Sequence, residues 1–210
     1  MAVFLTFTGN GTGETIDLTL QPPLVAPFTN WLVNALGGSD TVTGLGIADI
    51  INAGKGNDSV NAGGGDDTVT GDAGKDTLDG EAGNDSIEGG GGNDDIYGGN
   101  GADTLRGDAG KDAVDGENGN DDIAGGAGND SLTGGADGDT VNGDAGKDTV
   151  EGGTGNDRVN GGADDDFVSG GDGDDFVNGG AGNDFLLGGE AVGDNDVFAF
   201  NTAGDSSANP

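Results

Sequence analysis

Aspartate recurs along this chain at a constant interval of nine residues, and carboxylates repeated at fixed spacing are candidate ligands for a hard metal ion. The series contains 17 aspartates without a slip, and each lies two residues before an aliphatic residue. Paired carboxylates can also hydrolyse glycosides, but here repetition makes every pair equivalent, which indicates structural metal sites. The aspartates are Asp40, Asp49, Asp58, Asp67, Asp76, Asp85, Asp94, Asp103, Asp112, Asp121, Asp130, Asp139, Asp148, Asp157, Asp166, Asp175 and Asp184.

Aliphatic residues and glycines keep the same register as these aspartates. A glycine lies four residues before the aliphatic in all but three units, where Ile47, Asp137 and Asp164 replace it. Chance cannot produce so long a register in a merely Gly-rich, Asp-rich sequence. The aliphatic residues are Val42, Ile51, Val60, Val69, Leu78, Ile87, Ile96, Leu105, Val114, Ile123, Leu132, Val141, Val150, Val159, Val168, Val177 and Leu186.

Each nine-residue unit predicts a tight turn followed by a very short strand. The first six residues are rich in glycine, which adopts positive φ without a Cβ clash. The last three, such as residues 131–133, alternate in direction, so the central aliphatic points inward. Two units then form one flattened coil of 18 residues, and stacked coils about 4.8 Å apart give a rod of roughly 40 Å.

The unit resembles the nonapeptide G-G-x-G-x-D-x-U-x of the RTX (repeat-in-toxin, hemolysin-type) calcium-binding repeat family. The clearest copies read GGAGND at 125–130 and 179–184, and the resemblance covers roughly residues 34–189. It implies an all-β fold, a right-handed parallel β-roll with two nine-residue units in each coil. It also implies that each Ca²⁺ lies between turns that are two units apart. Its ligands would be carbonyls of repeat positions 2 and 4 from one turn, carbonyls of positions 1 and 3 from the other, and both position-6 aspartates.

Charge and composition show why such a chain needs cations. The 210 residues include 50 Gly and 40 acidic against 6 basic residues, a formal net charge of −34. Few apolar residues and high charge normally mean disorder, and this charge repels nucleic acid and anionic membranes. With no His or Cys, zinc is excluded as the structural ion.

Calcium is the ion that the pattern favours. One buried aliphatic contributes about 1.5–3 kcal/mol, whereas ordering nine backbones costs about 1–2 kcal/mol per residue. Ca²⁺ accepts six to eight oxygen ligands, while Mg²⁺ retains its waters. We expect up to about 15 ions, one between each two turns stacked along a side of the roll. Calcium is doubtful at Asp40 and Asp49, because Leu36, Leu45 and Ile47 replace glycines there.

Three units share the string Gly-Asp-Ala-Gly-Lys-Asp and begin at positions 71, 107 and 143, four units apart. Lys75, Lys111 and Lys147 should therefore form one line along the roll. Duplication with balancing of surface charge explains the line, and a binding ridge or an ion pair that replaces a cation is the alternative.

The chain divides into an N-terminal capping segment (1–36), the calcium-binding β-roll (37–189) and a C-terminal capping strand and tail (190–210). We expect short strands with a helical turn around Trp31 in the first segment. Phe167 and Phe185 should stack outside the roll, with Phe176 on the opposite face, and the closing strand at 196–200 should cover those rings.

Function follows from these expectations. With every carboxylate pair in a repeat and no His or Cys, no enzyme is visible in this chain. The resemblance implies a monomeric structural module of a secreted bacterial protein that is exported by type I secretion and folds on Ca²⁺ outside the cell, without membrane insertion. Residues 1–14 lack the features of a cleaved signal peptide. The alternatives are an adhesin, a glycan- or ice-binding module, and an accessory domain of a secreted hydrolase or epimerase.

Overall fold

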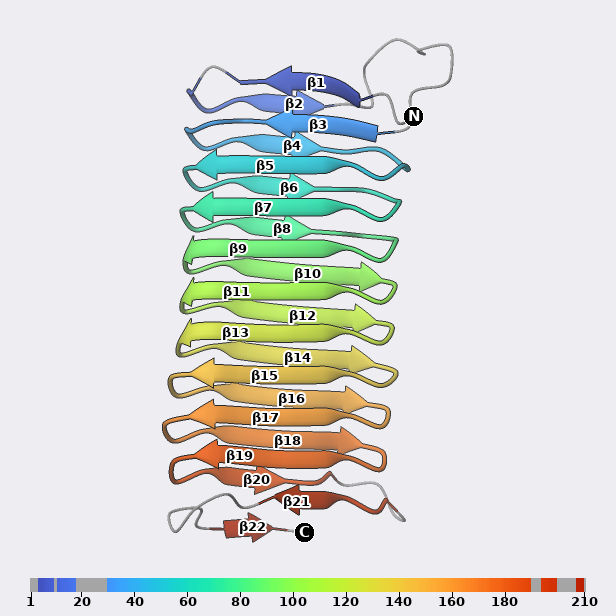
Figure 1. The fold of residues 1–210 in the computed structure, drawn as a ribbon, viewed down its shortest axis with the longest axis vertical. Coiled ribbons are helices and arrows are strands. Elements are labelled where there is room, and N and C mark those ends of the chain that lie inside the picture. Colours follow the sequence, from blue (N-terminus) through green and yellow to red (C-terminus); the bar gives the residue numbers. More distant parts are fainter. Residues whose placement is uncertain (1–3, 10, 18–29, 190–193, 200–206, 210) are drawn as a thin grey trace.

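The computed structural model describes residues 4–9, 11–17, 30–189, 194–199 and 207–209, which form two parallel sheets stacked face to face along one rod (Figure 1). Sheet A contains β1 (Phe4–Thr8), β3 (Asn30–Asn34), β5 (Ile50–Lys55), β7 (Thr68–Ala73), β9 (Ser86–Gly92), β11 (Thr104–Gly110), β13 (Asp122–Gly128), β15 (Thr140–Ala145), β17 (Arg158–Ala163), β19 (Phe176–Ala181) and β21 (Val197–Ala199). Sheet B contains β2 (Thr15–Asp17), β4 (Thr41–Thr43), β6 (Ser59–Asn61), β8 (Thr77–Asp79), β10 (Asp95–Asn100), β12 (Ala113–Asn118), β14 (Ser131–Ala136), β16 (Thr149–Thr154), β18 (Phe167–Asp172), β20 (Phe185–Leu187) and β22 (Ser207–Asn209).

Successive strands along the chain alternate between the sheets, and strands one coil apart pair in parallel. Leu105 of β11 lies opposite Ile123 of β13, and Val114 of β12 lies opposite Leu132 of β14. This register confirms the predicted parallel β-roll with 18 residues per coil. No helix among the described residues is long and apolar enough to cross a membrane.

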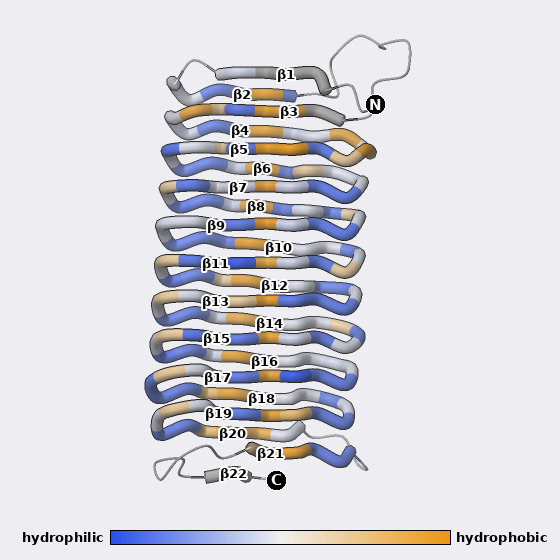
Figure 2. Tube along the Cα trace, in the orientation of Figure 1, coloured by the Kyte–Doolittle hydropathy of each residue, from blue (hydrophilic) through white to orange (hydrophobic). Residues whose placement is uncertain are grey.

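A single row of aliphatic side chains from each sheet forms the core. All 17 aliphatics of the repeat are at most 2% exposed, and Val33 and Ile16 extend the same row toward the N-terminus. Figure 2 shows this row as a narrow apolar stripe along strands whose turns are hydrophilic. Because the core is only one side chain wide in each layer, the turns need stabilisation of their own.

Most strands are longer than the three residues that the repeat predicted. In β13, the pairing with β15 continues past the aliphatic residue through Gly126, which lies opposite Asp144. The first residues of each turn therefore also take part in the parallel ladder, since glycine there lets the backbones of adjacent coils approach. The coils are consequently joined along the strand and into the turn.

The N-terminal segment adds coils to the roll. Strand β2 pairs with β4, so that Ile16 lies opposite Val42, and β1 pairs with β3 in the other sheet. Trp31 lies in β3, so the predicted helical turn is wrong, while the side chains of Phe28 and Trp31 lie outside the described residues. Ten spacings of about 4.8 Å give a rod of about 50 Å, longer than the sequence predicted.

At the other end, the aromatic rings stack as predicted but are not covered by the closing strand. The ring centroids of Phe167 and Phe185 are 5.4 Å apart, and the rings remain 40% and 41% exposed. Strand β21 pairs with β19 in sheet A, whereas both rings belong to strands of sheet B. The prediction of coverage was wrong for these two rings, because the coil continues its alternation between sheets after the inserted residues; the closing strand instead places Val197 opposite Phe176.

Candidate metal sites

The position-6 aspartates form a buried ladder along each side of the roll. The backbone N–H of each aspartate from Asp40 to Asp166 donates to Oδ1 of the aspartate 18 residues later, at N···O distances of 2.6–3.0 Å. All 17 carboxylates are between 0 and 4% exposed. Carboxylates this deeply buried normally have a paired charge or bind a metal.

The second carboxylate oxygen of these aspartates has no hydrogen-bond donor. Among the described residues, Oδ2 is buried and has no hydrogen-bond donor in every position-6 aspartate of the ladder from Asp40 to Asp175 except Asp49. Buried polar atoms in native proteins are nearly always satisfied, so an unsatisfied one calls for a bound ion or water. A whole row of such atoms, repeated once in every coil on each side, indicates a row of cations.

In most units from Gly71 onward, the unsatisfied oxygen lies beside the glycine at repeat position 1 and a carbonyl from the next coil. A Cβ placed on Gly71 would lie 2.6 Å from Asp76 Oδ2 and 2.5 Å from the carbonyl oxygen of Gly89. A carboxylate oxygen and a carbonyl oxygen from adjacent coils therefore lie close together beside this glycine, and Ca²⁺ prefers oxygen ligands of both kinds. Among the described residues, no group of three or more acidic side chains is arranged to hold a metal unaided.

Burial also raises the free energy of the ionised aspartates when no cation is bound. Desolvation raises the pKa of Asp67, Asp139 and Asp166 to about 7, against an ordinary value of 3.8. Backbone donors partly oppose this rise in pKa, and the charges of neighbouring aspartates add to it. For the same reason burial raises the pKa to about 6 at Asp76, Asp85, Asp112, Asp121, Asp148 and Asp175.

Comparison with known families agrees with this geometry. A sequence model of four copies of the RTX calcium-binding nonapeptide repeat matches the chain in overlapping windows that together span residues 34–186. The chain belongs to this family. RTX repeats bind Ca²⁺ in their turns, and the number of repeats implies multiple ions. No curated protein sequence matches the chain in a direct comparison.

The two turns at which calcium was doubtful differ from one another in the RTX roll. Asp40 resembles the other aspartates, because its Oδ2 is buried without a partner. Asp49 does not, because the backbone N–H of Leu45 donates to Asp49 Oδ2 at 3.1 Å. A donor therefore already contacts the oxygen that has no donor in the neighbouring turns. The geometry therefore disfavours a calcium ligand at Asp49 but not at Asp40.

We expect substitution of Asp103 and Asp49 to have unequal effects on calcium content. Asp103→Asn should remove at least one bound ion and shift the calcium-folding midpoint upward several-fold, because Asp103 Oδ2 has no other partner. Asp49→Asn should leave the ion count unchanged. Equilibrium dialysis followed by metal analysis gives the stoichiometry, and equal losses in both variants would contradict the distinction.

Two acidic residues outside the predicted series extend the ladder. The backbone N–H of Glu14 donates to Asp40 Oδ1 at 2.6 Å, and that of Asp175 donates to Asp196 Oδ1 at 3.2 Å. Their separations of 26 and 21 residues hid them from a search at period nine. The remaining signal was an acidic residue two positions before Ile16 and Phe198.

A second ladder runs along the outside of the turns in the opposite direction. Side chains at repeat position 5 accept a hydrogen bond from the backbone N–H one coil later; Asn93 Oδ1, for example, accepts from Lys111 at 2.9 Å. The same contact joins Asn129 to Lys147 at 3.0 Å. The recurring Asn-Asp pairs were its sequence signal. Inner and outer ladders together hold successive turns in register around the metal spaces.

The line of lysines is mostly a line of surface ion pairs. Lys75 Nζ lies 2.6 Å from Asp95 Oδ2, and Lys147 Nζ lies 2.6 Å from Asp165 Oδ2. Lys111 has Asn129 and Ser131 at the equivalent places and forms no ion pair with the part of the chain that the structure describes. Exposed pairs of this kind stabilise a fold by about 0–1 kcal/mol, and they involve none of the buried aspartates.

Non-glycine residues at the turn positions adopt the left-handed backbone that glycine would. Asp137 and Asp164 at position 4 both have φ of 77°, as the prediction of strained turns implied. At position 2, Asp72, Asp108 and Asp144 have φ between 68° and 71°. Aspartate tolerates this region better than most residues, so the turn conformation persists and every carbonyl keeps its place in the stack.

We expect two glycines of one turn to respond differently to alanine. A Cβ on Gly89 would lie 2.7 Å from Asp94 Oδ2 and 3.0 Å from the Gly107 carbonyl, whereas a Cβ on Gly91 would meet only the Asp72 carbonyl at 3.8 Å. Gly89→Ala should therefore weaken calcium binding at this turn and cost about 1–3 kcal/mol. The matched control Gly91→Ala should be neutral within about 1 kcal/mol.

Calcium content and thermal unfolding in saturating calcium distinguish the two variants. Natural alanines at position 1 of the early units (Ala35, Ala53 and Ala62) are fully buried, which shows that the roll can accommodate a methyl group there. We therefore expect Gly89→Ala to fold and to bind calcium more weakly at this turn. If Gly89→Ala binds calcium as tightly as the unchanged chain, calcium does not bind beside the position-1 glycine.

Proposed function

We propose that this chain is a structural module of a secreted bacterial protein that remains unfolded at low calcium and folds on Ca²⁺ outside the cell. The observation that carries the proposal is the row of buried carboxylate oxygens without donors. Metal binding and folding are one equilibrium when the ligand set exists only in the folded chain. RTX repeats form structural elements and are not usually catalytic, and we propose no catalytic activity for this chain.

The proposed ligand residues are the aspartates of the ladder together with turn carbonyls. Asp184, at the end of the ladder, is one candidate. The others are the aspartates whose Oδ2 has no hydrogen-bond donor among the described residues: Asp40, Asp58, Asp67, Asp76, Asp85, Asp94, Asp103, Asp112, Asp121, Asp130, Asp139, Asp148, Asp157, Asp166 and Asp175. When bound, Ca²⁺ would bridge carboxylates of adjacent coils and neutralise their charge. About 15 ions would balance 30 of the 34 net negative charges.

We also propose a role for each of the three segments of the chain. Residues 37–189 form the calcium-dependent roll, and residues 1–36 and 190–210 cap its two ends. Caps are needed because an open terminal coil would present unpaired strand edges to other chains. We expect the module to act as a monomer, and its negative charge disfavours nucleic acid and anionic membranes as partners.

The calcium concentration at which the chain folds tests the extracellular role. Extracellular calcium modules bind with dissociation constants of about 10⁻⁴–10⁻³ M, and cytosolic sensors with about 10⁻⁷–10⁻⁵ M. We expect a cooperative circular dichroism transition in the extracellular range, with no transition in Mg²⁺. Folding at or below about 10⁻⁶ M would mean that the chain folds inside the cell, and the proposed function would then be rejected.

A further inference from the structure

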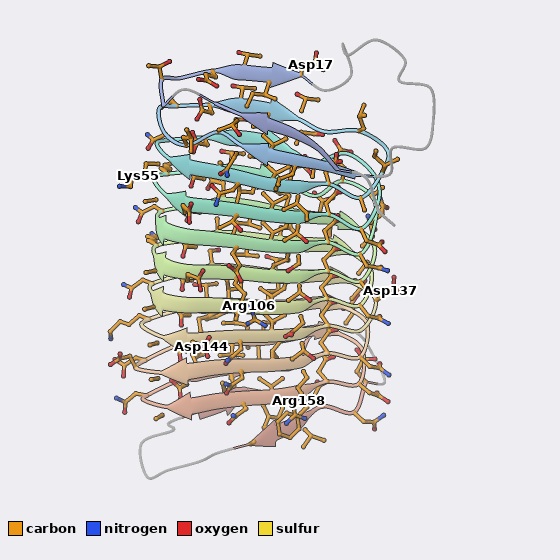
Figure 3. The ribbon with its side chains drawn as sticks, turned by 45° about the horizontal axis from the view of Figure 1, so that its top comes forward. Asp17, Lys55, Arg106, Asp137, Asp144 and Arg158 are labelled. Carbon is orange, nitrogen blue, oxygen red and sulfur yellow. The ribbon has the colours of Figure 1, made fainter. Side chains whose placement is uncertain are left out.

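A groove of about 530 Å³ lies on the outer face of sheet A, on the side of the strands that faces away from the aliphatic core. Its lining comes from β11, β13, β15, β17 and β19. Figure 3 shows Arg106, Asp144 and Arg158, which line it, on one face of the roll. At Ala124 of β13 a methyl group lies between the longer side chains of Arg106 and Asn142 in the flanking strands, which leaves the face hollow.

Both arginines of the sequence line this groove, whereas the four lysines lie in turns or at the end of a strand. The Arg158 guanidinium carbon lies 4.5 Å from the centre of the Phe176 ring. Arg106 Nη2 lies 3.7 Å from Asp122 Oδ2. Strands β11 and β17 are three spacings apart in sheet A, so the strands that carry the two arginines are about 14 Å apart. They stand toward the two ends of the groove.

Three asparagines form a row of amides beside Arg158 and Phe176, at the position two residues further along the strands of sheet A. Asn178 Nδ2 donates to Asn160 Oδ1 at 2.7 Å, and Asn160 Nδ2 donates to Asn142 Oδ1 at 2.6 Å. The row ends where Asn142 Nδ2 donates to Asp144 Oδ1. Each amide can donate two hydrogen bonds and accept two, so the ladder leaves donors and acceptors for a ligand.

This row is not a by-product of the repeat. The equivalent positions in the adjacent part of sheet B are Thr133, Glu151 and Ser169. Asparagine therefore recurs on one face only, over three successive coils. The row of asparagines, the two arginines and Phe176 all differ from the repeat pattern, and all of them line this one groove.

We propose that the groove binds a neutral oligosaccharide. Asp122 and Asp144 balance the two arginines, so the groove has no net formal charge in a chain whose net charge is −34. A polyanion would meet the surrounding negative field, while a neutral ligand rich in hydroxyl groups would not. The planar guanidinium fork and the amide row offer paired donors at fixed positions. Arg158 is held against the ring and is thus oriented before the ligand arrives.

Isothermal titration of the calcium-loaded chain with three neutral hexasaccharides (cellohexaose, maltohexaose and mannohexaose) tests the proposal. We expect at least one to bind with a dissociation constant of about 0.1–1 mM or tighter, and a hyaluronate hexasaccharide to bind more weakly. Backbone amide shifts on titration should be confined to strands β11 to β19 of sheet A. Binding by none of the neutral probes, or stronger binding by the hyaluronate hexasaccharide, overturns the proposal.

Matched variants separate the groove from the rest of the roll. Ala124→Gln fills the floor of the groove and Asn160→Ala interrupts the amide row, so each should weaken binding at least tenfold. Thr133→Gln and Ser169→Ala make the corresponding changes on sheet B and should leave binding unchanged. Circular dichroism in calcium verifies that all four variants fold. If the groove variants bind as the control variants do, the ligand binds elsewhere and the assignment is wrong, while calcium-dependent folding is unaffected.

Discussion

Chelation of calcium at neutral pH is expected to unfold the roll. The folded rod is about 50 Å long from end to end, whereas the unfolded coil should have a radius of gyration alone of about 50 Å. Without cations, the buried row of aspartates leaves 15 carboxylate oxygens from Asp40 to Asp175 without a donor in the part of the chain that the structure describes. Each buried unsatisfied group costs about 1–3 kcal/mol, and more when charged. That sum exceeds the roughly 5–15 kcal/mol by which folded domains are typically stable, and a core one aliphatic wide cannot offset it.

Small-angle scattering and limited proteolysis, each with and without chelator, measure this change. Mg²⁺ at the same concentration serves as the control. It should not restore the rod, because it prefers to retain water ligands and the carboxylates are at most 4% exposed. A chelated sample that stays compact and resists protease would show that the ladder tolerates its own charge, and the metal assignment would be lost with it.

Acidification of the chelated chain is expected to recover part of the fold. Burial raises the pKa of Asp67, Asp139 and Asp166 to about 7 in the folded chain, while an unfolded aspartate has a pKa of about 3.9. A group whose pKa is raised on folding binds its proton more tightly in the folded state. Its contribution to stability is complete below pH about 3.9 and is lost as pH rises through about 7.

In the metal-free chain, the β signal should therefore grow as the pH falls from about 7.5 toward 5. Calcium affinity should change in the opposite direction, because Ca²⁺ must displace protons from these carboxyl groups. Circular dichroism with sedimentation velocity at each pH distinguishes folding from aggregation. Calorimetric titration with calcium, in buffers of different ionisation enthalpy, gives the number of protons released. A chelated chain that is equally unfolded at pH 5 and pH 7.5 would contradict the prediction.

The nine-residue period was sufficient to predict the roll and its ladder of carboxylates. The position of Val114 relative to Leu132, one coil apart, follows from the repeat, because identical coils make identical contacts with their neighbours. The same argument placed Asp103 beside Asp121. Chemistry that every unit shares is local in this fold, so spacing and residue type were enough to infer it.

Features that break the period were visible only in the folded chain. Asp196 joins the ladder across 21 residues and Glu14 across 26, since the inserted residues leave the strand pairing on either side intact. At Asp49 the Leu45 N–H donates to Oδ2, the oxygen that lacks a donor at Asp40 and Asp58. The sequence indicated doubt at this turn but could not show which atom was responsible.

The sequence alone therefore established the repeating part of this protein: the coil, the inward aliphatics and the spacing of the acidic ligands. Only the tertiary structure decided what occurs once, such as the groove in which Arg106 and Arg158 share one face with Phe176. These residues come from three different coils of the roll. The physical reason is that the period determines which positions lie side by side, whereas the contacts of the side chains there, such as Arg158 against Phe176, depend on neighbours that differ from coil to coil.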